Sequence, residues 1–98
     1  MLNNAEFMTH RELIADIHRY ARARAWRIFQ TWGGDRPRPG HPDLVLLRFQ
    51  RVVFVCAHAE SDPISKDRAD WLDGLWAAGQ EAYCWRPSDW WAVEKILD

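Results

Sequence analysis

The chain has 98 residues and a mass of 11.6 kDa, the size of a single domain. Hydrophobic residues make up 48% and charged residues 28%, a composition that can form a folded core and excludes a disordered tail. The sequence has no apolar run near the roughly 20 residues that a membrane-spanning helix needs. Met1–Phe7 lacks the basic start and apolar middle of a secretory signal. These features predict one cytoplasmic domain, residues 1–98, that does not enter a membrane.

The formal net charge of -1 is unevenly distributed along the chain. Residues 1–51 contain nine arginines against five acidic residues, whereas residues 52–98 contain four basic residues against nine acidic ones. Two of the arginines, Arg36 and Arg38, lie in a segment rich in glycine and proline. The basic half could face the phosphates of a nucleic acid, and the simpler alternative is an arginine-rich helix face in solvent.

Seven tryptophans are more indole than a core of this size easily encloses. Tryptophan is enriched at protein interfaces, because its large apolar ring carries a polar N–H group. We therefore expect some of these side chains at an interface with a partner, and we expect the chain to form a homodimer. The tryptophans are Trp26, Trp32, Trp71, Trp76, Trp85, Trp90 and Trp91.

The first elements are indicated by a helix signal followed by an alternating segment. Thr9-His10-Arg11-Glu12 has the pattern of a capping box, and apolar residues then recur at helical spacing, which predicts an amphipathic helix to about Arg24. Side chains alternate with a period of two from Trp26 to Thr31, which predicts a strand. The glycines and prolines of Gly33–Gly40 interrupt both kinds of element, which predicts a flexible basic loop.

Three further strands are indicated by β-branched and aliphatic residues. The stretch from Asp43 to His58 predicts two strands joined by a tight turn, and Glu81–Trp85 predicts a short fourth strand. The two cysteines, Cys56 and Cys84, lie inside these stretches, so we expect reduced thiols rather than a structural disulfide.

Two more helices are predicted on either side of the last strand. Ser65 is expected to cap a helix that ends at Gly79, and Ser88 or Asp89 is expected to cap a last helix that runs through Leu97. The first of these helices carries an apolar stripe formed by Trp71, Leu72, Leu75 and Trp76. Of this stripe, Trp71, Leu72 and Leu75 are expected to be buried against the sheet. The order α-β-β-β-α-β-α predicts an α/β domain with a mixed sheet flanked by helices.

A series of landmarks along residues 10–97 resembles one nuclease family. It begins with Gly40-His41-Pro42-Asp43-Leu44 and continues through a hairpin to Val53-Phe54-Val55. The later landmarks are Ser65, Trp71-Leu72, Ala78-Gly79 and Tyr83-Cys84-Trp85-Arg86-Pro87-Ser88-Asp89. Their order and spacing resemble the VRR-NUC family of the PD-(D/E)xK nuclease superfamily, and the resemblance implies the fold of that superfamily.

The resemblance implies a site for metal-dependent hydrolysis of phosphodiesters. Mg²⁺ or Mn²⁺ would be held by carboxylate oxygens, one from the Pro-Asp element and another from a Glu-x-Lys element. Asp43 occupies the first position, but Cys56 stands where the Glu belongs and His58 where the Lys belongs. Arg68 replaces a helix Gln, and Gln30 stands where a His is expected. A thiol is a poor ligand for Mg²⁺, so the ordinary nuclease site is incomplete.

Several readings of this altered site remain open. Activity could have been relocated, with Asp43 and His58 assisted by Lys66 from the helix that follows Ser65. Glu60 lies about 13 Å beyond Cys56 along an extended strand, too far to replace the missing Glu. Asp43, Cys56 and His58 could instead bind Zn²⁺, or the two replaced side chains could simply fill a vacated pocket. The other histidines show no partner pattern: His10, His18 and His41.

The interpretation that follows is a nuclease fold with impaired catalysis that acts by binding. The expected partner is DNA or another protein, and the expected contact residues are Arg36, Arg38 and Arg68. The resemblance also implies a phage or mobile-element origin and a homodimer. No cofactor is expected, and binding of Mg²⁺ or Mn²⁺ at Asp43 would be weak or absent. The alternative is an active metal-dependent DNA endonuclease that uses Asp43 with relocated residues.

Overall fold

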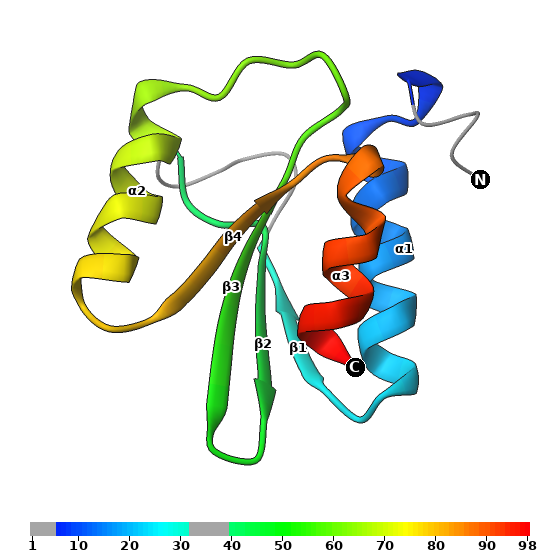
Figure 1. Cartoon of the computed structure of the whole chain (residues 1–98), viewed down its shortest axis with the longest axis vertical. Helices are drawn as coiled ribbons and strands as arrows, with labels where there is room; N and C mark the ends of the chain where they lie inside the picture. The colour runs from blue at the N-terminus through cyan, green and yellow to red at the C-terminus, as the bar shows by residue number, and fades with distance from the viewer. Residues whose placement is uncertain (1–5, 32–39) are drawn as a thin grey trace.

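The computed structural model describes residues 6–31 and 40–98, and over these residues it contains a four-stranded sheet and three α-helices (Figure 1). In chain order the elements are α1 (His10–Ala23), β1 (Arg27–Gln30), β2 (Leu44–Arg48), β3 (Arg51–Ala57), α2 (Lys66–Ala77), β4 (Glu81–Trp85) and α3 (Trp90–Leu97). This order confirms the predicted α/β class with a mixed sheet. Within the described ranges, no helix is long and apolar enough to cross a membrane.

The strands lie side by side in the order β1-β2-β3-β4. The first three form an antiparallel meander, and β4 returns parallel to β3 after the crossover through α2. Figure 1 shows α1 and α3 together on one side of the sheet and α2 on the other. Cys56 and Cys84 are register partners on β3 and β4, and both thiols are free, as expected.

Helix α1 begins at the predicted capping box. The hydroxyl of Thr9 accepts a hydrogen bond from the Glu12 amide at 3.1 Å, and the Glu12 carboxylate accepts one from the Thr9 amide at 2.9 Å. These two bonds satisfy amide groups that an uncapped helix would leave unpaired. The buried face of the helix consists of Leu13, Ile14, Ile17 and Ala21.

The core lies between the sheet and the pair α1 and α3. The strands contribute alternate residues to it because successive side chains of a strand point to opposite faces. Trp26 is buried here, and its indole donates a hydrogen bond to the Leu97 carbonyl at 2.9 Å. This bond connects the residue before β1 to the end of α3. The strand residues of this core are Leu44, Leu46, Val53, Val55, Ala57 and Trp85.

Helix α2 is less buried than its sequence predicted. Ser65 caps it as expected, accepting a hydrogen bond from the Arg68 amide at 3.1 Å. The prediction that Trp71, Leu72 and Leu75 are buried is wrong, because none of the residues of Lys66–Ala77, all of them described, is fully buried. The physical reason is its position. Helix α2 packs against β4 at one edge of the sheet, and no other helix or strand of residues 6–31 and 40–98 covers its outer side.

One other prediction changes, at the start of α3, and another lies mostly outside the described residues. Ser88 and Asp89 do not cap α3 with their side chains, because a 3-10 turn, Pro87–Asp89, precedes the helix. The Asp89 carboxylate accepts from the Arg86 amide, and the Ser88 hydroxyl donates to Glu60. The predicted basic loop, with Arg36 and Arg38, lies outside the described residues except for Gly40.

The α1 side of the sheet is more deeply buried than the α2 side, so truncation of a leucine on each side should lower the free energy of unfolding by different amounts. Leu46 is fully buried, so Leu46→Ala should lower the free energy of unfolding by about 2–5 kcal/mol. Leu72 is only half-buried, so Leu72→Ala should lower it by about 1 kcal/mol. Urea denaturation of both variants measures the difference, and equal losses would contradict the assignment of the core to the α1 side.

Candidate functional site

The site is built around the carboxylate of Asp43, just before β2. The backbone of Asp43 is held on both sides, since its amide donates to the Val55 carbonyl at 2.8 Å and its carbonyl accepts from the Thr31 amide at 2.9 Å. The side chain is only 13% exposed. Its carboxylate therefore lies at a fixed place at the end of the sheet, where β2 starts and β3 ends.

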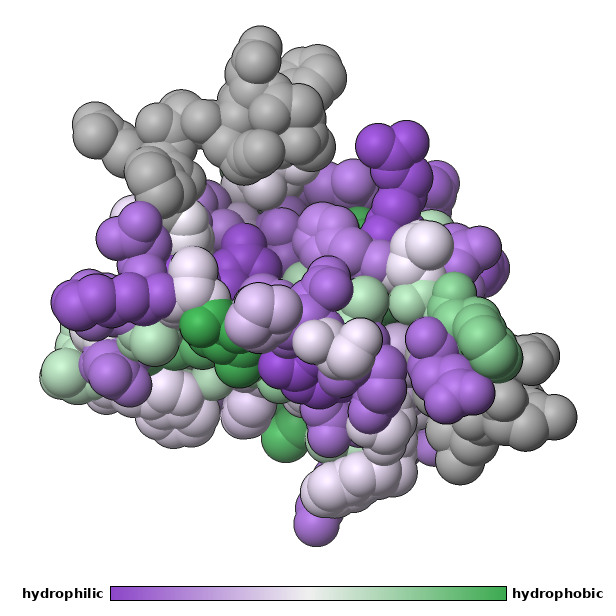
Figure 2. All heavy atoms as spheres, turned by 90° about the horizontal axis from the view of Figure 1, so that it is seen from above, coloured by the Kyte–Doolittle hydropathy of each residue, from purple (hydrophilic) through white to green (hydrophobic). Residues whose placement is uncertain are grey.

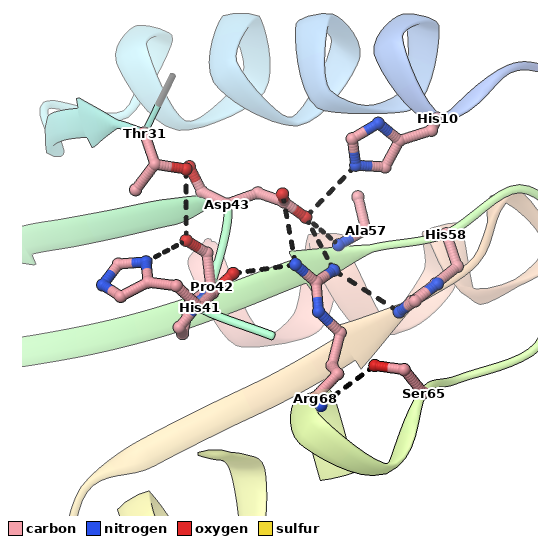
Figure 3. A network of polar contacts seen from close by, with 9 residues as sticks. All are labelled: His10, Thr31, His41, Pro42, Asp43, Ala57, His58, Ser65 and Arg68. Atoms are coloured by element: carbon pink, nitrogen blue, oxygen red, sulfur yellow. Dashed lines mark hydrogen bonds and ion pairs between the residues drawn. The ribbon is translucent and has the colours of Figure 1, made fainter. Parts of the chain in front are cut away.

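Four hydrogen bonds converge on this carboxylate (Figure 3). Arg68 donates from Nη1 to Oδ2 at 3.1 Å and from Nη2 to Oδ1 at 3.4 Å. The Ala57 amide donates to Oδ2 at 2.8 Å, and Nε2 of His10 lies 3.3 Å from the same oxygen. The donors come from α1, β3 and α2, so one carboxylate joins three elements to the start of β2.

The side chain of Arg68 makes further hydrogen bonds besides those to Asp43. Its Nη2 also donates to the His41 carbonyl at 2.8 Å, and its Nη1 donates to Nε2 of His58 at 3.4 Å. Like Asp43, its side chain is 13% exposed. The guanidinium thus donates to several acceptors at once, among them both oxygens of one carboxylate, and such bidentate pairs are the strong ones.

Gly40 permits this approach between α2 and the chain before β2. Its φ of +81° lies in the left-handed region, and a Cβ atom placed on it would come within 2.5 Å of the Asp67 backbone carbon. Any other residue would push the first turn of α2 away. The glycine therefore lets Arg68 reach Asp43.

The environment keeps Asp43 ionised and His58 neutral. Burial by itself raises the pKa of Asp43, but the hydrogen bonds from His10, Ala57 and Arg68 outweigh it and the pKa is lowered. Burial, followed by the positive charges of Arg68 and Arg86, lowers the pKa of His58. A neutral imidazole can accept a hydrogen bond at Nε2, as its contact with Arg68 requires.

The residues that could complete a metal site do not do so. Among the residues that the structure describes, no group of three His, Cys, Asp or Glu side chains is placed to hold a metal ion. Cys56 is buried, which raises the pKa of its thiol to about 12, so the thiolate that a metal needs is disfavoured. The alternative of a Zn²⁺ site at Asp43, Cys56 and His58 stays a prediction.

The structure places Lys66, the proposed relocated helper, and Glu60, which the spacing had excluded, in ion pairs or hydrogen bonds away from Asp43. The Lys66 side chain is 88% exposed and pairs with Asp70 at 3.0 Å on the outside of α2. Glu60 is engaged with Ser88. Sequence reasoning singled out Arg68 as a contact for a partner and found no pattern for His10, yet both bind Asp43. Two signals were available for Arg68. The resemblance places it at a helix Gln position of the nuclease site, and the Ser65 cap fixes its place in the first turn of α2.

A polar cleft of about 460 Å³ opens beside this cluster. A second hollow of about 400 Å³ continues from it along α1 and shares Arg11, Ile14 and Gln30. Figure 2 views the molecule from above and shows polar side chains over most of that end. The arginines along the two hollows are Arg11, Arg19, Arg22 and Arg68, and the histidines are His10, His18 and His58.

Comparison of the chain with protein-family models, with curated proteins and with solved structures gives no match. The chemistry of the site has to be inferred from the residues that form it.

Removal of the Arg68 guanidinium should destabilise the protein, because the buried Asp43 carboxylate would lose its ion-pair partner. Arg68→Met should lower the free energy of unfolding at neutral pH by about 3–5 kcal/mol, because Asp43 would remain ionised without its partner. The double variant Arg68→Met with Asp43→Asn should recover most of this loss. Denaturant titrations test both, and an Arg68→Met chain as stable as the parent would contradict the description of the pair.

The lowered pKa of His58 makes stability depend on pH in one direction. The unfolded histidine takes up a proton near its ordinary pKa of 6.5, whereas the folded one does so only at lower pH. The contribution of neutral His58 to the free energy of unfolding should therefore be fully present above pH 6.5. It should be lost as the pH falls from there through the folded pKa. The test is the melting temperature between pH 8 and pH 5 for the parent and for His58→Asn. An identical pH dependence in the two proteins would refute the role of His58.

Proposed function

We propose that this chain is a VRR-NUC-like nuclease fold that no longer cleaves and instead binds nucleic acid through its cationic cleft. The observation that carries the proposal is the guanidinium of Arg68 on the carboxylate of Asp43. In a metal-dependent nuclease this carboxylate would hold a cation. In this chain the guanidinium of Arg68 occupies the place of that cation.

The state of the carboxylate argues against hydrolysis. Both oxygens of Asp43 accept hydrogen bonds from Arg68, and Oδ2 also receives the Ala57 amide and faces His10. A divalent ion would have to displace the guanidinium and compete with its charge. The position where the resemblance places a second carboxylate holds Cys56, whose buried thiol stays protonated.

The arrangement of the cluster supports the resemblance on which the proposal rests. Asp43 directly precedes β2, and Ala57, between Cys56 and His58, lies at the end of β3. The 2.8 Å hydrogen bond from Ala57 to Asp43 brings the Pro-Asp segment and the altered Glu-x-Lys segment together. These two segments would have to meet if the chain descends from a nuclease with that active site.

The cleft has the charge and shape for a phosphate backbone. From the Asp43 cluster it continues along α1 past Arg11, His18 and Arg22. Over the described part of the chain, no carboxylate lies within ion-pair distance of Arg11 or Arg22, whereas Arg19 pairs with Asp16. Such arginines can neutralise successive phosphates.

The sequence-based contacts fit this binding role to different degrees. Arg36 and Arg38 lie outside the described residues and remain predictions as contacts for the same ligand. Arg68 lies in the wall of the cleft, but its charge is already shared with Asp43. It therefore organises the cleft more than it attracts phosphate.

If Asp43 does not bind a metal ion, divalent ions should have no effect on the stability of the protein. Mg²⁺ or Mn²⁺ at millimolar concentration should not raise the melting temperature, because a ligand that does not bind the folded state adds no stability. The triple variant Cys56→Glu, His58→Lys and Arg68→Gln should gain a heat of Mn²⁺ binding in calorimetry. Cleavage of DNA by the parent, abolished by Asp43→Ala, would instead establish the alternative of an active endonuclease.

Binding of a phosphate backbone predicts a strong dependence on salt. Anisotropy of a labelled DNA duplex should show an affinity that falls steeply with salt, and Arg11→Ala with Arg22→Ala should reduce the log–log slope by about 2, near 0.9 for each lost contact. Arg27→Ala, an exposed arginine on β1 outside the cleft, is the matched control and should leave the slope unchanged. Undetectable binding, or binding insensitive to salt and to the cleft arginines, would overturn the nucleic-acid proposal.

A further inference from the structure

The tip of the β2–β3 hairpin exposes an aromatic side chain that does not pack against the core. The loop between the paired residues Arg48 and Arg51 consists of Phe49 and Gln50. Phe49 is 92% exposed, more than any other large apolar side chain of residues 6–31 and 40–98. It belongs neither to the hydrophobic core nor to the residues packed against it. Its ring therefore adds little to the stability of the fold, because burial of apolar surface is what stabilises.

The backbone at Phe49 is also unfavourable for this residue type. Its φ of +56° lies in the left-handed region, which favours glycine. One other non-glycine residue of the described chain has a positive φ, Ala25, which directly follows the C-cap of α1, where this conformation is common. A two-residue hairpin loop that begins at positive φ is best formed by glycine, asparagine or aspartate at its first position. Neither the turn nor the core accounts for a phenylalanine here, which points to a contact outside the chain.

The residues on both sides of the loop are held in place. The guanidinium of Arg48 lies 4.4 Å from the centre of the Trp26 ring, and that of Arg51 lies 5.6 Å from it. Arg51 also forms an ion pair with Glu81 on β4 at 2.6 Å. The hairpin thus presents the exposed phenyl ring at a fixed position, so little conformational entropy would be lost when a ligand binds it.

The hairpin lies at the end of the arginine-lined hollow along α1. That hollow reaches Arg22 in the last turn of the helix. The Arg48 side chain donates a hydrogen bond to the carbonyl of Arg24, the C-cap of α1, at 3.1 Å, so the hairpin contacts the end of the helix. Figure 1 shows the hairpin extending beyond the ends of α1 and α3. A strand whose phosphates bind along α1 would be directed toward Phe49.

We propose that Phe49 stacks on an unpaired base, so that the chain prefers single-stranded to double-stranded DNA. This inference rests on the proposed function, because the phosphates of the strand would occupy the cationic hollow. Exposed aromatic rings beside a cationic path are how proteins bind single strands, since bases have flat apolar faces and the backbone is anionic. Within a duplex each base is covered by its neighbours, so the ring can stack only on an unpaired base.

The shape of the tip favours a base over a lipid surface. The loop offers one ring beside the polar Gln50, which matches the face of a single base. Binding to a membrane surface needs a larger apolar face formed by several residues. The occupant that fits the tip is therefore one base of a nucleic acid strand.

Anisotropy of a labelled oligothymidine strand of about 15 nucleotides and of a labelled duplex of the same length tests the preference. The parent should bind the strand more tightly. Phe49→Ala should raise the dissociation constant for the strand at least about tenfold, equivalent to about 1.4 kcal/mol. It should leave the affinity for the duplex and the salt slope unchanged, because the ring carries no charge. A Phe49→Ala chain that binds the strand as tightly as the parent would overturn the inference.

Phe49→Gly separates this contact from a structural role. Glycine adopts a positive φ without strain, so the variant should melt at or above the parent temperature. It should nevertheless bind the strand as weakly as Phe49→Ala, whereas Phe49→Trp should retain the binding. Trp91→Ala removes an exposed aromatic ring from α3 and is the matched control, which should leave the affinity unchanged. A Phe49→Gly chain that loses stability and strand binding together would contradict the proposed contact.

The outcomes distinguish this inference from the proposed function. If the duplex binds through Arg11 and Arg22 and the strand binds no more tightly than the duplex, the proposed function stands and the inference fails. If neither nucleic acid binds, the proposed function fails, and the inference fails with it. Binding to vesicles of phosphatidylcholine and phosphatidylserine that Phe49→Ala abolishes, without an effect on the strand, would assign the loop to a lipid surface and overturn the base contact.

Discussion

The ion pair between Asp43 and Arg68 is the interaction on which the arrangement of this domain depends. It connects the start of β2 to the first turn of α2, and the same carboxylate also binds the end of β3 and the start of α1. A carboxylate that is 13% exposed would be costly without a cation beside it. In metal-dependent nucleases that cation is an ion taken from solution, whereas here it is a side chain with a fixed position.

This substitution has consequences for both binding and chemistry. A guanidinium offers no exchangeable coordination position and cannot activate a water molecule as a metal does. It does hold the end of the sheet together, because its positive charge balances the carboxylate that joins the segments. The cleft and its extension along α1 lie beside this ion pair. A fold can lose catalysis in this way while its binding surface persists, as we propose for this chain.

Much of the fold followed from local signals, and the failures share one cause. The capping box at Thr9, the alternation in the strands and the cap at Ser65 involve residues close in sequence, and each was predicted correctly. Burial of α2 was predicted wrongly because an apolar stripe indicates that a helix has a hydrophobic face but not what covers it.

The candidate site shows the same limit. Asp43 was identified from its motif, but its partners lie 25 and 33 residues away, at Arg68 and His10. The contact of Arg68 with Asp43 depends on the close approach at Gly40, which no periodicity reveals. The most direct test of the account is a crystal grown with Mn²⁺ and measured for anomalous scattering. The account predicts Arg68 on Asp43 and no anomalous peak there, whereas a Mn²⁺ peak on the Asp43 carboxylate with Arg68 displaced would contradict it.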